Sequence, residues 1–569
     1  MRTLVVAGLA AVLSSAAAAS PTVPVHYTLA PVLDGTAVVA LRVTARFAGD
    51  RSGVTRFDWP ASWAGEDRLA QWTRDLTVDG AQSVEPAPHG GRIIHAAPGA
   101  ALTVSYRVVS AYAADPSAAD SRQASPVVRP GWFYAVGEAL FATPAGRGDV
   151  PVRFHWHGAP GIGFASDLEH DRARPGHVTK TVDDLSESIV IGGRDLRVVR
   201  TVAGGAPLRV ATIGRYGFET AAFETLVARV VVAERGFWRD RDAQPFLVTM
   251  IALAPDANRL SYSGTGRSDA FALWMDPQVE LPGLAWLLAH EYFHTWNARQ
   301  LGAMGNEEEE KVRYWLSEGF TDFYARRLML HAGLLTPDQF AQSWNDMLAA
   351  YARSPFRLKS NRDVAAVFWT DQLAEKIPYQ RGAMLAALWD ARLRARGDSL
   401  DAVMRDQRRR VAGMHTSGPI TELFVQAAAR HGLDVRPDVA RYVERGEAIE
   451  LPRDVWGRCA AVATITRPVF VRGWDAEATA KAGNVVTGLD AASPAHAAGL
   501  RDGMTIVRRV AGVPGDSGRD YVLTVSDAGR ERRIAFRPAG RETETLQQIV
   551  LDRAAFAAAP AACAAALAG

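Results

Sequence analysis

Two histidines one helical turn apart are the residues of this 569-residue sequence best suited to chemistry. They belong to the run His290-Glu291-Tyr292-Phe293-His294. Side chains four positions apart lie on the same face of a helix, so His290 and His294 can bind a single zinc ion. Glu291 lies beside them, where its carboxylate can accept a proton from a water that the metal activates. The spacing therefore predicts a zinc site with Glu291 as general base.

A catalytic zinc ion takes three protein ligands and leaves one position open. Glu318, within Tyr314-Trp315-Leu316-Ser317-Glu318-Gly319-Phe320-Thr321-Asp322, is the candidate for the third ligand. Apolar residues surround it, so a carboxylate there is costly to bury unless it has a cation, either the metal or an ion-pair partner. Asp322, one turn later, is expected to accept the free ring N–H of His290, or else lies on the helix surface. Gly319 is expected to let this helix pack closely against the histidine helix.

The segment that carries the histidines is expected to be helical. Pro282 is a good first-turn residue, and leucines at helical spacing after it give the segment a buried face. A mainly helical pattern runs from Leu281 to about Val443. Short strands are expected before it, at 246–251 and 270–275, where β-branched and apolar residues are concentrated.

The N-terminal third of the sequence predicts strands. From Val23 to about Val199, runs such as 37–45 and 102–109 are rich in β-branched residues and are separated by Gly, Pro and Asp. His155-Trp156-His157 places two imidazoles on one face of such a strand. Without a nearby third ligand we interpret them as ordinary strand residues rather than as a metal site.

The C-terminal part of the sequence predicts a linker at Pro452–Gly457 and then a small β-rich unit up to about Pro538. An alanine-rich tail follows Leu551. The two cysteines, Cys459 and Cys563, either pair in an oxidising compartment or remain structural thiols, and their spacing does not decide between these.

Length and charge limit the classes of function. A chain of 569 residues exceeds one hydrophobic core, so three or four folded units are expected. The formal net charge is +2 and no basic block is present, which argues against nucleic acid as a partner.

The first residues have the pattern of an export signal. Arg2 precedes a short apolar run, Leu4–Leu13, and Ala17–Ala19 offer small residues for a signal peptidase. Residues 1–19 are therefore predicted to be a signal peptide, with a retained membrane anchor as the alternative. No later stretch is long and apolar enough to span a bilayer, so the mature chain is expected to lack a membrane span and to be periplasmic or secreted.

The sequence resembles the glycyl aminopeptidase family of zinc metallopeptidases. The resemblance rests on His290-Glu291-Tyr292-Phe293-His294-Thr295-Trp296-Asn297 and on Trp315-Leu316-Ser317-Glu318-Gly319-Phe320-Thr321. It implies membership of the gluzincin clan, a Zn²⁺ cofactor with two histidine ligands and one glutamate ligand, and peptide or protein substrates. It also implies a multidomain α+β architecture with a β-rich N-terminal domain, a thermolysin-like catalytic domain and a PDZ-like C-terminal domain.

The resemblance extends to Pro378-Tyr379-Gln380-Arg381-Gly382-Ala383, which is similar to the family's Tyr-x-Lys-Gly segment with Arg in place of Lys. It implies that the phenol of Tyr379 donates a hydrogen bond to the oxyanion of the tetrahedral intermediate. Without the resemblance, a lone tyrosine in a helical stretch is interpreted as core.

The resemblance is weaker before the zinc helix. Family members with aminopeptidase activity carry a Gly-Gly-Leu-Glu-His-like stretch there, whose glutamate suits the substrate's free amine. This sequence has Ser261–Ala270, which contains Gly264, Gly266 and Asp269 as candidate substrate-binding residues but no glutamate. Asp269 is a candidate substitute, whereas Arg267 favours a carboxylate or a carbonyl. The thermolysin-like fold implies that substrate pairs with an edge strand near Phe271–Met275.

Two further segments have open interpretations. Ser493–Met504 resembles a stretch of bacterial PDZ domains, with Phe470–Trp474 as a loose match to the carboxylate-binding loop; the unit either captures peptides by strand addition or only packs on the enzyme. The acidic run Glu307–Glu310 is interpreted as a solvated loop, with a docking surface for a basic substrate or a second cation as the alternative.

These observations combine into one hypothesis. The predicted divisions are a signal peptide (1–19), a β-rich domain (20–200), a zinc peptidase domain (201–450), a PDZ-like domain (455–540) and an alanine-rich tail (541–569). The predicted function is hydrolysis of peptide bonds, as an aminopeptidase. The alternatives are an endopeptidase or dipeptide hydrolase that does not need a free amine, and a peptide-binding protein with a vestigial metal site.

Overall fold

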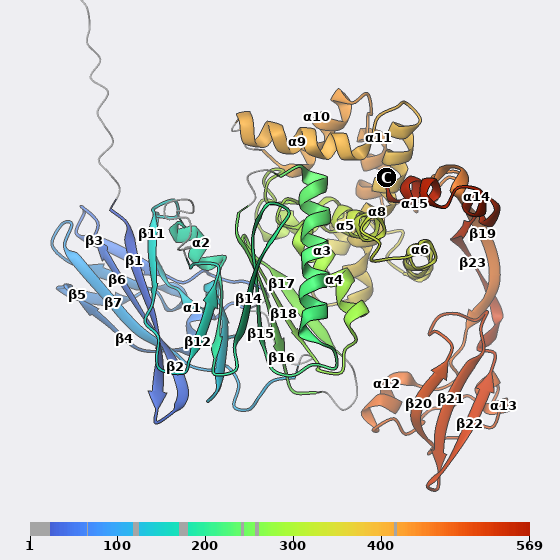
Figure 1. Ribbon diagram of the computed structural model, residues 1–569, viewed down its shortest axis with the longest axis horizontal. Coiled ribbons are helices and arrows are strands. Elements are labelled where there is room, and N and C mark those ends of the chain that lie inside the picture. The colour runs from blue at the N-terminus through green and yellow to red at the C-terminus, as the bar shows by residue number, and fades with distance from the viewer. Residues whose placement is uncertain are drawn as a thin grey trace, which may run out of the picture.

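The computed structural model describes residues 23–64, 66–117, 125–169, 180–240, 244–255, 261–414 and 418–569. The predicted signal peptide lies outside these residues. The chain forms a β-rich N-terminal region, a mixed sheet covered by helices, and a smaller C-terminal lobe (Figure 1). In the described part of the chain, no helix combines the length and the hydrophobicity that crossing a membrane requires.

The N-terminal region is built from three sheets. The largest has the order β11-β1-β2-β7-β4, with bounds β1 Val25–Asp34, β2 Ala37–Ala48, β4 Thr73–Asp79, β7 Ala101–Val108 and β11 Val152–Trp156. Strand β7 alternates regularly, because Leu102, Val104, Tyr106 and Val108 are buried while the residues between them are partly exposed. This period of two directs one face of the strand into the core, as the sequence predicts for a half-buried strand.

The other two N-terminal sheets are smaller. One has the order β10-β3-β6-β5 and the other β12-β13-β9-β8. Their strands are β3 Val54–Asp58, β5 Ser83–Pro86, β6 Arg92–His95, β8 Val127–Val128, β9 Trp132–Val136, β10 Thr143–Pro144, β12 Gly163–Ser166 and β13 Ile189–Gly193. Short helices connect them: η1 Leu69–Trp72, η2 Pro88–Gly90, α1 Gly137–Leu140 and α2 Val182–Ser186.

A five-stranded sheet lies beneath the helices of the middle region, in the order β14-β15-β16-β18-β17. Its strands are β14 Arg197–Ala203, β15 Ala206–Ile213, β16 Phe246–Ala252, β17 Tyr262–Gly266 and β18 Ala270–Met275. The two strands predicted from the sequence, β16 and β18, run parallel, and nearly all of their residues are buried. Strand β18 (Ala270–Met275) is flanked on both sides by β16 and β17, so it is not itself an edge strand. The edge strand at this side of the sheet is β17.

Helices cover this sheet and carry the candidate site (Figure 1). Their bounds are α3 Thr220–Trp238, α4 Leu281–Phe293, α5 Glu307–His331, α6 Pro337–Arg353, α7 Asn361–Ala365, α8 Gln372–Arg394, α9 Leu400–Met414, α10 Ile420–Arg430, α11 Arg436–Asp438 and η3 Val439–Glu444. One large hydrophobic core joins the sheet to these helices. The predicted start of α4 is confirmed, since Pro282 stands in its first turn.

Helix α5 begins with strong local signals. Asn306 and Glu309 form a reciprocal capping box in which each side chain accepts from the other residue's backbone N–H. The four glutamates Glu307–Glu310 occupy the first turn, where negative charge complements the helix dipole. The acidic run is therefore the start of a helix and not a loop.

The C-terminal lobe is attached through a long two-stranded ribbon of β19 (Ala460–Phe470) and β23 (Ala539–Leu551) (Figure 1). The lobe itself contains a three-stranded sheet and two short helices: β20 Thr505–Ala511, β21 Tyr521–Asp527, β22 Arg530–Phe536, α12 Ala476–Lys481 and α13 Pro494–Ala497. The predicted boundary at residue 541 falls inside β23, so 541–551 form part of the ribbon and not of a tail.

The segment predicted as a linker, Pro452–Gly457, instead belongs to the core. Val455 and Trp456 are buried, and the Trp456 ring packs against Trp344 of α6 with centroids 4.9 Å apart. An indole of this size buries a large apolar area, which fixes the segment to the helices of the main core.

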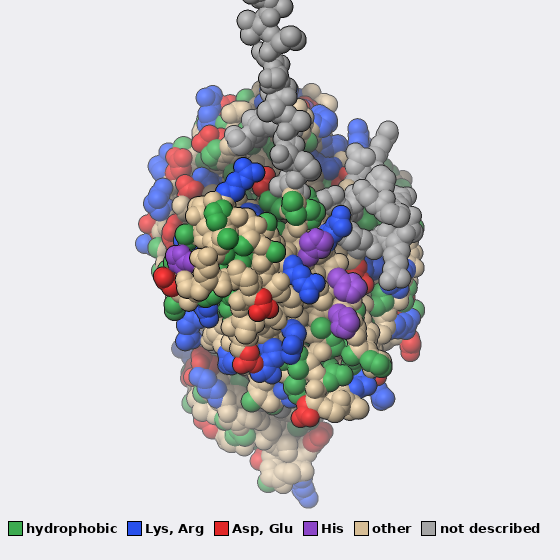
Figure 2. All heavy atoms as spheres, turned by 90° about the vertical axis from the view of Figure 1, so that its left-hand side faces the viewer, with side chains coloured by type: hydrophobic (Ala, Val, Ile, Leu, Met, Phe, Trp, Pro, Cys, Tyr) green, Lys and Arg blue, Asp and Glu red, His purple; other side chains and the backbone are tan. Residues whose placement is uncertain are grey.

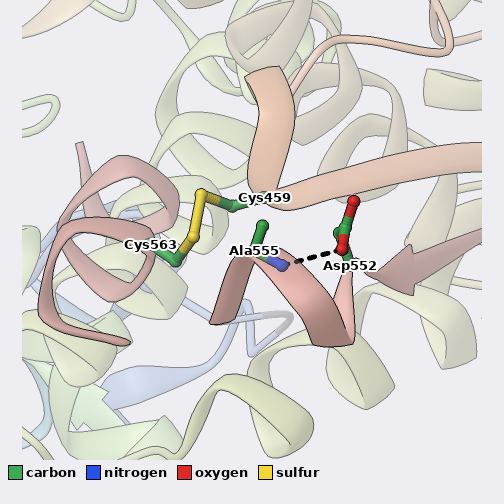
Figure 3. The surroundings of a disulfide bond; sticks show 4 residues. All are labelled: Cys459, Asp552, Ala555 and Cys563. Atoms are coloured by element: carbon green, nitrogen blue, oxygen red, sulfur yellow. Dashed lines mark hydrogen bonds between the residues drawn. A yellow bond between two sulfur atoms is a disulfide. The ribbon is translucent and has the colours of Figure 1, made fainter. Parts of the chain in front are cut away.

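The cysteines form a disulfide, which settles the alternative that the sequence left open. Cys459 lies in η4 (Gly457–Cys459), just before β19, and Cys563 lies in α15 (Pro560–Ala568), with Cα atoms 5.4 Å apart. Figure 3 shows the bond beside α14 (Arg553–Ala558), whose cap Asp552 accepts from the Ala555 N–H at 2.9 Å. The alanine-rich segment is thus helical and is cross-linked to the base of the ribbon.

Candidate metal centre

Helix α4 places the two histidines at its C-terminal end. Leu284 and Leu288 bury one face of the helix in the main core. His290 and His294 follow on the side that faces α5, and their Nε2 atoms lie 3.2 Å apart. Both rings therefore present the same nitrogen to one point, as the spacing predicts.

The carboxylate of Glu318 in α5 lies next to the Nε2 atoms of both histidines. Its Oε2 lies 3.2 Å from Nε2 of His290 and 3.4 Å from Nε2 of His294. The three ligand atoms lie within 4.8 Å of one another, and among the residues that the structure describes they are the one His/Cys/Asp/Glu group of three or more that is compact enough to hold a metal. Helix packing thus brings together three residues that the sequence separates by up to 28 positions.

Each histidine is held by its other ring nitrogen. His290 Nδ1 lies 2.9 Å from Oδ1 of Asp322, whose other oxygen lies 3.4 Å from Arg326. His294 Nδ1 lies 2.7 Å from the backbone carbonyl of Asn297. When both Nδ1 atoms carry the proton and donate it, both Nε2 atoms are free to bind a metal, which is the usual arrangement around zinc-binding histidines.

Asn297 is a supporting residue to which sequence reasoning assigned no role. Its side chain is completely buried, and its amide donates to the carbonyls of Leu316 and Ser317 at 3.2 and 2.8 Å and to Thr321 Oγ1 at 3.1 Å. One residue therefore ties the end of α4 to the part of α5 that carries Glu318. The one feature of the sequence that could have indicated this role is the position of Asn297 in the motif 290–297, on which the family resemblance rests.

The charges around the three residues suit a cation. Burial alone would raise the pKa of Glu318, but the neighbouring imidazoles of His294 and His290 hold it far below its usual range. Burial alone would lower the pKa of His290, but Asp322 and Glu318 raise it to about 10. The imidazoles and the carboxylates therefore stabilise one another's charged forms. Two imidazoles and a carboxylate form the donor set of many catalytic zinc sites, so the residues fit this metal.

Glu291 lies on the cleft side of α4 and is oriented by the sheet. The backbone N–H of Gly266, at the end of edge strand β17, donates to Glu291 Oε2 at 2.9 Å. A Cβ on Gly266 would lie 3.0 Å from the same oxygen, so glycine allows this close approach. Burial raises the pKa of the Glu291 carboxyl.

Tyr379 reaches the site from α8. Its ring lies against that of His290, with centroids 5.9 Å apart and planes inclined by 20°. Burial, followed by the negative charges of Glu318 and Asp322, raises the pKa of the phenol well above its usual value, so the hydroxyl stays protonated and can donate.

A glycine contact sets the position of α8. A Cβ on Gly382 would lie 1.7 Å from the carbonyl oxygen of Trp315, and one on Gly319 would lie 2.4 Å from the Cα of Gly382. The prediction that Gly319 packs against the histidine helix is wrong, because its close neighbour is α8. The physical reason remains the same, since only glycine allows two helix backbones to approach so closely.

A cavity of about 520 Å³ opens beside Glu291, His294 and Glu318. Gly264 and Gly266, two of the candidate substrate-binding residues, line it. Asp269 is not among the lining residues, because its carboxylate forms an ion pair with the buried Lys180 at 2.6 Å.

Arg267 also lines this cavity, but its guanidinium contacts residues of the N-terminal region. It forms a buried ion pair with Glu138, and its guanidinium stacks on the Trp63 ring, 4.5 Å from the centroid. Neither Asp269 nor Arg267 is thus placed in the way that an amine-binding glutamate would need.

The second histidine pair lies in the N-terminal region, where His155 belongs to β11, at the edge of its sheet, and His157 follows that strand. Both side chains are exposed, with ring centroids 6.4 Å apart. Figure 2 shows several histidine side chains at the surface on the side of the molecule that lies to the left in Figure 1. No carboxylate or third imidazole completes a metal-binding group with them within the described ranges.

Comparison with known proteins gives a family and a fold. Residues 283–382, which include both histidines, Glu318 and Tyr379, match the model of the M61 glycyl aminopeptidase family. No curated protein matches the chain in sequence.

Solved structures resemble much of the chain in fold. An aminopeptidase N family protein from Idiomarina loihiensis has a TM-score of 0.66 at 15% identity, over 93% of this chain and 98% of that one. An M1 zinc metallopeptidase from Deinococcus radiodurans has a TM-score of 0.49 at 15% identity, over 75% of this chain and 94% of that one. The first likeness shows that the β-rich N-terminal region and the helical middle region together follow an aminopeptidase-like architecture. The segment that carries the candidate metal centre is thus similar to the M61 glycyl aminopeptidase family.

Proposed function

We propose that this chain is a zinc-dependent peptidase that hydrolyses peptide bonds with Glu291 as general base. The observation that carries the proposal is the meeting of Glu318 with the Nε2 atoms of His290 and His294 beside a cleft. The match of residues 283–382 to a peptidase family model supports the same reaction.

His290, His294 and Glu318 would hold the zinc ion. When bound, zinc acts as a Lewis acid that lowers the pKa of a neighbouring water and polarises the scissile carbonyl. The Nδ1 contacts of the two histidines, to Asp322 and to the Asn297 carbonyl, support this assignment because they fix the ring orientation.

Glu291 and Tyr379 would handle the proton and the developing charge. The Glu291 carboxylate accepts a proton from the attacking water and returns it to the leaving amine. Gly266 holds one oxygen of that carboxylate by its N–H, which leaves the other oxygen for the water. Tyr379 remains a neutral phenol and donates to the oxyanion as it forms.

The substrate backbone would add to the sheet at β17. This strand is the edge of the sheet, and Gly264 and Gly266 on it line the cavity. An extended peptide pairs with an exposed strand edge through its main chain, which gives affinity without side-chain preference.

Aminopeptidase activity is the first candidate, because the family is described by that activity. A second candidate is an endopeptidase or dipeptide hydrolase that does not require a free amine. It is favoured by one observation: Asp269, the candidate substitute for the amine-binding glutamate, forms an ion pair with Lys180 instead. The peptide-binding protein with a vestigial metal site is the third, and the intact Glu291 counts against it.

The C-terminal lobe is proposed to be PDZ-like, in agreement with the order helix α13, glycine turn, strand β20. Strand β20 is at one end of its sheet and exposes Val507 and Val510, which suits capture of an extended peptide. A periplasmic or secreted location is proposed as well. The disulfide supports it, because such bonds persist in oxidising compartments.

Digestion of a mixed peptide library, followed by mass spectrometry, tests the proposal. The zinc-loaded protein should cleave peptides, and comparison of free with N-acetylated members separates the first two candidates. Glu291→Gln should keep its zinc and lose about 10²- to 10⁴-fold in rate, since that is the usual contribution of a general base. Stoichiometric zinc without cleavage of any member would favour the binding protein.

A further inference from the structure

The cavity beside the metal centre contains an acidic residue that no step of the proposed hydrolysis uses. Glu310 lies in the first turns of α5, eight positions before Glu318 on the same helix. It lines the cavity together with Glu291 and Glu318 and is half-buried there.

Glu310 differs from the other three glutamates of its run. Glu308 lies 2.7 Å and Glu307 3.9 Å from the ammonium of Lys311. Glu309 lies 3.5 Å from Arg313 and also caps the helix. Within the described part of the chain, Glu310 has no Lys, Arg or His within ion-pair distance.

A fourth glutamate, Glu187, also lines the cavity, but it is neutralised: it lies 2.8 Å from Arg299 and 3.7 Å from Arg267. Glu291 and Glu318 have roles in the proposed hydrolysis. Among the described lining residues, Glu310 is therefore the glutamate that has neither an ion-pair partner nor a role in that reaction.

The surroundings of Glu310 favour a cation next to it. Burial and the negative charges of Glu318 and Glu307 raise its pKa, whereas the His294 imidazole lowers it. A half-buried carboxylate that has no ion-pair partner is stabilised when a positive group hydrogen-bonds to it. A second metal ion would need further ligands, and the residues described here form no other metal-binding group of three. An ammonium group needs only an acceptor of this kind.

Resting on the peptidase function proposed above, we propose that Glu310 determines specificity by binding an ammonium group of the peptide substrate. Two groups share this chemistry, the α-amine of the chain and the side chain of lysine. Glu310 does not take part in the hydrolysis itself, so its loss changes which peptides are cleaved.

The variant Glu310→Gln tests this, because it keeps the size of the side chain and removes its charge. Glu308→Gln is the matched control, since this side chain is 80% exposed, does not line the cavity and lies in the same turn of α5. Glu309→Gln is unsuitable because Glu309 caps the helix.

Three substrates separate the two sources of the ammonium group: tetraalanine, N-acetyltetraalanine, and an N-acetylated tetrapeptide with one lysine. Glu310→Gln should lower kcat/KM about 10- to 100-fold on the peptides whose ammonium it binds, as expected for a lost hydrogen bond to a charged group. It should leave N-acetyltetraalanine unchanged. A loss confined to tetraalanine identifies the α-amine, and one confined to the lysine peptide identifies the side chain. An equal loss on all three peptides, or none on any, overturns the proposal.

Binding measurements keep this result separate from that of the peptidase proposal. Calorimetry in a Glu291→Gln background needs no turnover, and it should show tighter binding of an ammonium-bearing peptide than of N-acetyltetraalanine. The preference should disappear when Glu310→Gln is added and should survive Glu308→Gln. If the wild-type protein cleaves nothing but shows this pattern, the peptidase function fails and the role of Glu310 stands. If no preference for an ammonium group is found, the role of Glu310 fails.

Discussion

Two pairs of closely spaced histidines, His290/His294 and His155/His157, lie in the described part of the chain, and of these two the first alone belongs to the candidate metal centre. His290 and His294 project from α4, whereas His155 and His157 project from the edge of the N-terminal sheet at β11. Both spacings put two imidazoles on one face of their element. The difference between the pairs lies in their surroundings.

The α4 pair is surrounded by groups that fix it. Glu318 faces both Nε2 atoms, and Asp322 and the carbonyl of Asn297 hold the two Nδ1 atoms. The rings on β11 are exposed and contact each other only as tilted neighbours at 6.4 Å. The spacing of two histidines alone therefore does not identify a metal site. A third ligand from another element and buried hydrogen-bond partners for the ring nitrogens distinguish a candidate metal site from a pair of surface histidines.

Removal of the third ligand should make the first pair resemble the second. Glu318→Gln leaves two imidazoles without a carboxylate, so zinc affinity should fall by more than the roughly 100-fold that loss of a supporting residue can cost. Metal analysis after gel filtration should show about one zinc per chain in the wild type and little in the variant. Activity should be lost with the metal. Chelation followed by added zinc should restore the wild type only, and full zinc in Glu318→Gln would contradict the assignment.

Removal of a supporting partner should have a smaller effect. Asp322→Asn keeps the shape but no longer offers a carboxylate to His290 Nδ1. Zinc affinity should weaken about 10- to 100-fold, as is typical for such partners. Competition with a fluorescent chelator measures it. An unchanged affinity would mean that Asp322 contributes only its contact with Arg326.

The helix packing behind the first pair can be tested in the same way. Gly382→Ala adds a methyl group where the Trp315 carbonyl leaves no room, and overpacking of this kind costs about 1–3 kcal/mol. Urea denaturation should show this loss. Gly283→Ala in α4 is the control, because a Cβ there meets nothing within 4 Å and should be neutral or slightly stabilising. Equal stability of the two variants would show that the α5–α8 contact can relax.

The β11 pair should be dispensable. The double variant His155→Ala, His157→Ala removes two exposed side chains that have no third ligand. Zinc content and activity should remain within error of the wild type, and stability should change by less than about 0.5 kcal/mol, as for most surface substitutions. A fall in zinc content to one half would reveal a second site and end the distinction between the pairs.

Sequence reasoning succeeded where the signal is local. The strands β16 and β18 and the start of α4 follow from short patterns of β-branched residues and from Pro282. The histidine pair and Glu318 were found because each has a spacing or an apolar neighbourhood that is unusual for its type. The structure brings these three residues together.

It failed where the partner lies far away in the sequence. Asp269 is taken by Lys180, 89 positions earlier, and Gly319 packs on Gly382 of another helix. Trp456 was placed in a linker because Pro and Gly flank it, yet it fills the core against Trp344. Local composition carries no information on such pairings, because they are decided by how the elements pack.

The ribbon of β19 and β23 has a topological consequence. The chain leaves the helices of the main core at Cys459 and returns to the same place at the end of β23. There the Asp552 N–H donates to the Cys459 carbonyl at 2.9 Å. Cys563, a little later in the chain, forms the disulfide with Cys459. The disulfide closes residues 459–563 into a covalent loop, so a single backbone cut within this loop leaves the two fragments joined by the disulfide. Because β19 and β23 pair along the ribbon, a short turn joining these two strands would replace the lobe and leave the path of the rest of the chain unchanged.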